Sequence, residues 1–214
     1  MNIRKLGNSL LIFTINRLIE ILGIFIFFFG ILLFISLISY SPSDPNFIFP
    51  ENTEIKNILG FQGSYMADLF FQSSGLVSFL IPFTFIFTGI NIFRRKEAFL
   101  LIENTFFITL YTLIGTLFFS FYYKNSFSFY INGNGGFIGN YLNETFLLNI
   151  ILSYKDFFYY IFLILISSLF LKSLNFSIKG FLNFLRNIKK LVFKNREKIY
   201  TNKNEIISEY IPQD

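Results

Sequence analysis

Uncharged stretches of membrane length constrain the fold of this chain more than any other feature. Three runs contain no Asp, Glu, Lys or Arg: 21–40, 73–93 and 104–123. A helix needs about 20 apolar residues to cross about 30 Å of hydrocarbon. A fourth run, 157–171, is shorter, but Lys172 can extend its ammonium to the headgroups, so this span reaches residue 174. The sequence predicts an all-α, polytopic membrane protein with four transmembrane helices, 21–40, 73–93, 104–123 and 157–174.

The composition agrees with a membrane protein and narrows the possible chemistry. Of the 214 residues, 53% are hydrophobic and 34 are Phe, and there is no Cys, His or Trp. Thiolate and imidazole metal sites, disulfides and Ser-His-Asp triads are therefore excluded from this chain. Asp68, Glu103 and Glu144 are too scattered to suggest a catalytic carboxylate pair. We expect no catalytic residue, no metal site and no cofactor.

The first span could alternatively be a secretory signal peptide, because Arg4, Lys5 and Arg17 precede it. However, its uncharged run is long for a signal peptide, no A-x-A site follows it, and three more spans come after. We therefore interpret residues 1–20 as a cytoplasmic segment and residues 21–174 as a four-helix transmembrane domain.

The distribution of charge predicts the orientation of the spans. Basic residues gather before span one, in the Arg94-Arg95-Lys96-Glu97 link, and after span four, whereas the segment 41–72 has four acidic residues and only Lys56 as a base. Positive charge favours the cytoplasmic side, so both termini are expected there. This asymmetry accounts for most of the +5 net charge, and we expect no direct nucleic-acid binding by this segment.

The stretch "SYSPSDPNF" (39–47) begins the first outer connection. Pro42 and Pro45 lack an N–H and disfavour helix at the preceding residue, so they end span one. Asp44 is expected to cap a turn with its carboxylate. A simple helix stop explains the prolines without any further function.

The stretch "NILGFQGSYMADLFFQSSGLVSFLIP" (57–82) predicts a short interfacial helix that leads through Gly75 into span two. Gly60 and Gly63 flank a turn, Ser64 is the expected N-cap, and Asp68 would lie in the first turn, where the helix dipole favours a carboxylate. A proton or ion site at Asp68 is the alternative.

The second outer connection is rich in glycine. Gly133, Gly135, Gly136 and Gly139 suggest a backbone that turns tightly or lies against another backbone. It is not a phosphate-binding loop, because no Gly-Lys-Ser/Thr follows. A second interfacial helix is expected over 137–154.

After span four, residues 175–214 begin with a segment whose apolar residues follow a helical period, with lysines and arginines on another face. This pattern predicts a basic amphipathic helix on the inner leaflet, followed by the start of a linker. An ordinary positively charged flank of the last span is an equal alternative.

Taken together, these elements resemble the N-terminal four-helix membrane domain of bacterial FtsK/SpoIIIE-family DNA translocases. The residues that carry the resemblance are Ser39, Tyr40, Pro42, Asp44, Pro45, Asn57, Gly60, Gly63, Tyr65, Ala67, Asp68, Gly75, Pro82, Arg94, Arg95, Gly135, Gly136 and Gly139. The resemblance implies a bacterial inner-membrane, multi-pass anchor at the division septum, acting in cytokinesis and chromosome partition. It implies contacts with membrane lipids, division proteins and other copies of the chain, up to the hexamer of the full-length family.

In that family a cytoplasmic motor hydrolyses ATP and binds DNA. This sequence contains no G-x-x-x-x-G-K-[ST], so we expect the chain itself not to be an enzyme. It is either part of a longer translocase or a freestanding relative of its membrane domain. The alternative function is a small transporter or channel subunit, which the scarcity of charge within the spans disfavours.

Overall fold

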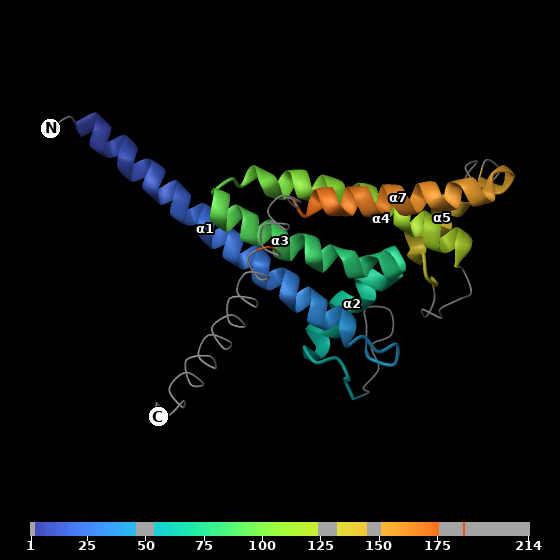
Figure 1. Cartoon of the computed structure of the whole chain (residues 1–214). Coiled ribbons are helices and arrows are strands. Elements are labelled where there is room, and N and C mark those ends of the chain that lie inside the picture. The colour runs from blue at the N-terminus through green and yellow to red at the C-terminus, as the bar shows by residue number, and fades with distance from the viewer. Residues whose placement is uncertain (1–2, 46–53, 124–131, 145–150, 176–185, 187–214) are drawn as a thin grey trace, which may run out of the picture. The chain divides into compact units, whose positions relative to one another are not determined.

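The computed structural model describes residues 3–45, 54–123, 132–144 and 151–175, together with Arg186. This part of the chain contains helices and no strands. The elements are α1 (Ile3–Ile38), α2 (Gly60–Ser74), the 3-10 helix η1 (Gly75–Phe79), α3 (Leu80–Arg95), α4 (Phe99–Tyr122), α5 (Gly136–Asn143) and α7 (Lys155–Ser173). Residues 1–175 form one compact unit (Figure 1).

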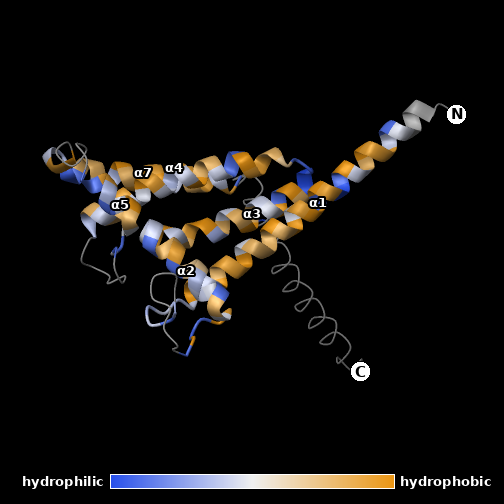
Figure 2. Cartoon of the chain, turned by 180° about the vertical axis from the view of Figure 1, so that it is seen from behind, coloured by the Kyte–Doolittle hydropathy of each residue, from blue (hydrophilic) through white to orange (hydrophobic). Residues whose placement is uncertain are grey.

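Four segments are long and apolar enough to cross a membrane: Gly7–Ile38, Gly60–Arg95, Phe99–Tyr122 and Lys155–Ser173. In Figure 2 hydrophobic residues run along these helices, and the connection between α3 and α4 is hydrophilic. The protein is thus an all-α, polytopic membrane protein, as the sequence predicts.

Helices α1 and α3 pack as a close pair (Figure 1) because glycines let their backbones approach. A Cβ at Gly23 would lie 2.9 Å from the Gly89 carbonyl oxygen, and one at Gly30 would lie 2.9 Å from the Ile86 nitrogen. A Cβ at Gly89 would lie 2.5 Å from the backbone nitrogen of Phe27. In lipid, helices associate through van der Waals packing, which such close approach maximises.

Helices α4 and α7 form a second pair, held largely by aromatic side chains. Phe118 lies against the Tyr159 ring, with 5.4 Å between centroids, and close to Phe162. The hydroxyls of Tyr123 and Tyr159 are 2.8 Å apart and share a hydrogen bond. Tyrosines at the end of a span suit the border between hydrocarbon and water.

Buried polar side chains join α3 to α4 and to the end of α7. Thr84 Oγ1 lies 3.1 Å from the Tyr111 hydroxyl and 2.9 Å from Ser173 Oγ. One turn further, Asn104 donates to Thr88 Oγ1 at 2.7 Å. Hydrogen bonds of this kind hold membrane helices together at about 0.6–2 kcal/mol each.

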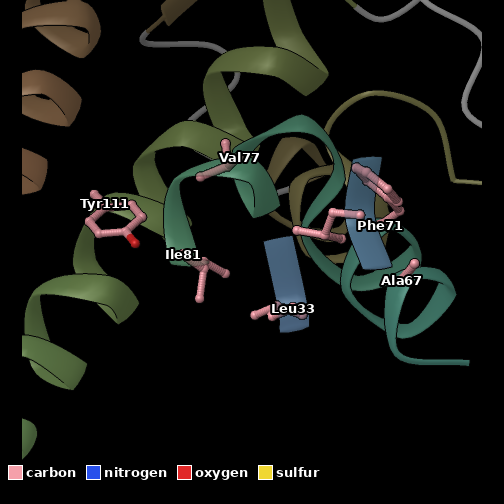
Figure 3. Packing of buried hydrophobic residues seen from close by; sticks show 7 residues of the cluster. Leu33, Ala67, Phe71, Val77, Ile81 and Tyr111 are labelled. Carbon is pink, nitrogen blue, oxygen red and sulfur yellow. The ribbon is translucent and has the colours of Figure 1, made fainter. Parts of the chain in front are cut away.

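The largest hydrophobic cluster lies where α1, α2, η1, α3 and α4 meet. Figure 3 shows its side chains converging from these elements. Its buried members are Leu33, Leu37, Ala67, Phe71, Val77, Ile81 and Tyr111. The cluster holds α2 and η1 against the spans, so it fixes the connection between α1 and α3 in place.

Several helix boundaries differ from the expected ones. α1 begins at Ile3, 18 residues before the expected span. α2 begins at Gly60 with Leu59 before it and no side-chain cap, so Ser64 is not its N-cap and Asp68 lies in mid-helix rather than in the first turn. The expected helix over 137–154 corresponds to α5 and to helical residues at 151–153, with 145–150 outside the described residues. The expected amphipathic tail helix also falls outside them.

Candidate functional site

The two connections at the α2 and α5 end of the spans are joined into one hydrogen-bonded assembly. We call it the cap: residues 39–45, 54–75 and 132–143. It lies at the end of the spans opposite Arg94 and Arg95.

Asp44 organises the first connection. Its side chain is 3% exposed, and its two carboxylate oxygens accept from the backbone N–H groups of Lys56 and Asn57, at 2.9 and 2.8 Å. The carboxylate thus binds amides twelve and thirteen residues away, rather than those of its own turn. Charge-assisted bonds of this kind are about twice as strong as neutral ones.

Ser36 and Asn57 fasten this connection to α1. Asn57 Nδ2 donates to the Ser36 carbonyl at 2.9 Å, and Ser36 Oγ donates to the Gly63 carbonyl at 2.6 Å. A Cβ at Gly63 would overlap the Asn57 side-chain oxygen. Gly63 is therefore needed for the close approach of α2 to Asn57. The next residue, Ser64, donates its hydroxyl to the Pro45 carbonyl at 2.9 Å.

A chain of hydrogen bonds crosses from the first connection to the second. Tyr40 donates its hydroxyl to Asp68 Oδ1 at 3.2 Å, and Gln72 Nε2 donates to the same oxygen at 3.3 Å. Asn132 Nδ2 donates to Gln72 Oε1 at 3.0 Å. Asn140 Nδ2 in turn donates to the Asn132 carbonyl at 2.9 Å.

Gly75 and Asn134 form the closest backbone contact between the two connections. The N–H of Leu76 donates to the Asn134 carbonyl at 2.9 Å. Gly75 has φ +61°, and a Cβ there would overlap the Asn134 carbonyl oxygen. Gly136, at φ +65°, also lies close to the first connection, because its would-be Cβ is 2.6 Å from the Ser73 carbonyl oxygen. Neither glycine can carry a side chain without separating the connections.

Gly135 and Gly139 seat the second connection on α4. A Cβ at Gly135 would lie 2.6 Å from the Thr116 carbonyl oxygen, and one at Gly139 would overlap the same atom. Ser120 Oγ adds a 3.2 Å hydrogen bond to Asn140 Oδ1. The glycine-rich sequence thus serves backbone approach, as its composition predicts.

The structure therefore brings together residues that the sequence singles out, among them Tyr40, Asp44, Pro45, Asn57, Gly63, Asp68, Gly75, Gly135, Gly136 and Gly139. Tyr65 lies on α2 beside a pocket of the cap. Pro42 is exposed in the turn after α1, and Gly60, at φ +66°, begins α2.

Three further residues lie away from the cap. Pro82 is buried in α3, with its carbonyl oxygen against Gly30. Arg94 and Arg95 are exposed in the last turn of α3, where the helix dipole favours cations. Beside them Lys96 pairs with Glu20 of α1 at 3.0 Å.

Among the described residues no group of three or more His, Cys, Asp or Glu could hold a metal ion. Sequence reasoning missed Ser36, a polar residue within the apolar run 21–40, and Asn134, which lies between Gly133 and Gly135. The position of Ser36 was a usable signal, because a polar group buried in an apolar run needs a partner.

Replacing Asp44 with alanine should destabilise the cap by about 2–4 kcal/mol, because a buried backbone amide, that of Asn57, and a part-buried one, that of Lys56, lose their acceptor. Chemical unfolding in detergent measures the loss. Glu54→Ala, which removes an exposed carboxylate from the same connection, should change stability by less than about 0.5 kcal/mol. Equal effects of the two variants would contradict the role of Asp44.

Comparison with known proteins adds independent information. The family described as the 4TM region of DNA translocase FtsK/SpoIIIE matches residues 16–185. A DNA translocase FtsK of Rickettsia prowazekii is 30% identical over 111 residues, which are 50% of this chain and 14% of the relative. That of Rickettsia typhi is 26% identical over 110 residues, 50% and 15% of the two chains. The match thus spans about one seventh of these relatives, and no solved structure matches the chain.

Proposed function

The chain belongs to the family of the 4TM region of FtsK/SpoIIIE DNA translocases, and we propose that it is the membrane-anchoring and septum-targeting part of a cell-division translocase. In this proposal the spans hold the protein in the inner membrane of a bacterium, with the cap outside and both termini in the cytoplasm. The cap contacts other division proteins, and the cytoplasmic tail leads to the motor.

The observation that carries the proposal is the joining of two separate connections into one cap. Hydrogen bonds from Tyr40 through Asp68, Gln72 and Asn132 to Asn140 give this end of the protein a defined surface. A defined surface loses less conformational entropy on binding than two free loops do. The cap is therefore preorganised for a protein partner.

Charge supports the proposed orientation. Arg94, Arg95 and Lys96 lie together at the end of the α1 and α3 pair remote from the cap, and basic residues favour the cytoplasmic side. The proposal gives the chain no enzymatic role and no direct contact with DNA. Its copies associate in the membrane and bring the motor subunits together.

Localisation in dividing cells tests the proposal. Full-length chain fused to a fluorescent protein should concentrate at the septum, and a fusion of residues 176–214 alone should not. The Asp44→Ala variant, whose cap is weakened, should lose septal enrichment while remaining in the membrane fraction. The Glu54→Ala variant is the matched control and should localise as the unchanged chain does.

Two outcomes would overturn the proposal. One is septal enrichment of residues 176–214 without the spans. The other is uniform membrane fluorescence of the full-length chain in cells whose septa are marked by another division protein.

A further inference from the structure

The cap contains a pocket between α2 and the second connection. Its volume is about 310 Å³, and the residues that line it are Tyr65, Asp68, Leu69, Gln72, Ser73, Asn132 and Phe137. One carboxylate and two aromatic rings thus face a space between segments that are more than 50 residues apart in sequence. The hydrogen bonds of the cap hold these segments together, so the pocket is preformed.

Asp68 is the one charged group that lines this pocket. Its side chain is 4% exposed, and the hydrogen bonds described for it, from Tyr40 and Gln72, both go to Oδ1 and come from neutral groups. Among the described residues both ion pairs are made by Glu20, at the other end of the spans, and none by Asp68. A buried carboxylate without a cationic partner is costly unless a ligand supplies one.

We propose that this pocket binds a basic side chain, arginine or lysine, from a partner protein on the outer side of the membrane. The inference rests on the proposed function, since it names the chemistry by which the cap recognises a partner. The cation meets Asp68, and its aliphatic stem packs against Leu69. An arginine fits this site best because its planar group can bond a carboxylate and stack on a ring at the same time.

The aromatic residues strengthen this assignment. Tyr65 and Phe137 line the same pocket as Asp68, and Phe137 is 62% exposed. A cation near an aromatic face gains about 0.5–2 kcal/mol, depending on its desolvation. A carboxylate and two aromatic rings in one pocket therefore favour a cation over a neutral or anionic group.

A lipid headgroup is the competing occupant, since Tyr40 lies just after α1 and so places Asp68 near headgroup depth. The pocket disfavours it. An ethanolamine headgroup carries a phosphate beside its ammonium, and the lining includes no basic residue to balance that phosphate. A basic side chain brings positive charge alone and matches the single carboxylate.

Tryptophan fluorescence can test the proposal, because the chain contains no Trp. Phe137→Trp places one reporter at the pocket and keeps an aromatic ring there. The full chain in nanodiscs is titrated with N-acetylarginine methylamide, with its neutral citrulline counterpart, and with glycerophosphoethanolamine. We expect a saturable signal with the arginine compound and none with the citrulline compound.

Two further variants locate the site. Asp68→Asn, which keeps the shape of the side chain, should weaken arginine binding by about tenfold or more. Leu69→Lys, at a residue 49% exposed, introduces a competing cation beside Asp68 and should abolish arginine binding. This variant tests the site if Asp68→Asn does not fold. Glu144→Gln, which removes an exposed carboxylate after α5, is the matched control and should bind as before.

Several results would overturn the inference. They are no saturable binding of the arginine compound, equal binding of the citrulline compound, unchanged binding in both Asp68→Asn and Leu69→Lys, and binding of glycerophosphoethanolamine in preference to arginine. The last result would assign the pocket to lipid.

Localisation separates this inference from the proposed function. If the unchanged chain reaches the septum and the folded Asp68→Asn variant does so equally well, the targeting proposal stands and the pocket is not its contact. If the unchanged chain fails to reach the septum, the targeting proposal fails whatever the pocket binds.

Discussion

Replacing Gly75 with alanine is expected to destabilise the protein by about 3 kcal/mol or more. The residue has φ +61°, and a Cβ would overlap the Asn134 carbonyl oxygen. That atom belongs to a backbone held by the hydrogen bond to Leu76, so it cannot move aside without opening the cap. Denaturant titration in detergent measures the loss of stability.

Gly60→Ala provides the matched control, because Gly60 has a similar φ of +66° but no atom within 4 Å of its would-be Cβ. This variant carries the backbone strain without the overlap, and about 1 kcal/mol is expected. Equal losses at the two glycines would show that strain alone acts at Gly75, and that the contact with Asn134 contributes nothing.

Replacing Gly89 with valine should separate α1 from α3 and cost about 3 kcal/mol. The new Cβ would meet two backbone atoms of α1, the Phe27 nitrogen at 2.5 Å and the Gly23 oxygen at 2.6 Å. Because neither can rotate away, the whole helix must move. Water does not enter the hydrocarbon to fill the gap between separated helices. Lipid chains compete with the partner helix for the faces of α1 and α3 that the separation exposes.

The separation can be measured as a distance, since the chain has no native cysteine. Spin labels on cysteines at Ile24 and Ile90, both partly exposed beside the glycine contact, should move apart in Gly89→Val. Gly7→Ala, in the part of α1 with no neighbour within 4 Å of the would-be Cβ, should leave the distance unchanged. An unchanged distance in Gly89→Val would contradict the close approach of the helices.

The sequence predicts the all-α class and the four spans because the physics that sets them is local. Hydrocarbon thickness fixes the length of an apolar helix that crosses a membrane. Each of the four runs can therefore be recognised from its own length and composition, without knowledge of its neighbours. Gly135, Gly136 and Gly139 could likewise be recognised as positions where the backbone approaches another backbone.

Which backbone each glycine approaches could not be predicted, because that depends on tertiary packing. Gly23 and Gly30 are seven residues apart, and this spacing was the available signal for one helix face. Ser64 was expected to cap α2, but it bonds Pro45 instead, so a tertiary partner overrode a local preference.

For the polar contacts inside the membrane, too, the sequence indicates which residues share a helix face but not which residues they contact. Thr84 and Thr88 are four residues apart, so a common face on α3 could have been predicted from the sequence. Their partners, Tyr111 and Asn104, could not, since many pairings of α3 with α4 are compatible with the same spacing.

The Gly75 contact with Asn134 has a consequence for biosynthesis. Helices α1 and α3 can pair once the first 95 residues have been translated, because all their glycine contacts lie within that segment. The contacts that join the first connection to the second must wait until residue 140 has been translated, since Asn132, Asn134 and Asn140 supply them. The nascent protein therefore assembles in two steps. A ribosome stalled after α3 leaves α1 and α3 paired, while Gly75 lacks its contact with Asn134.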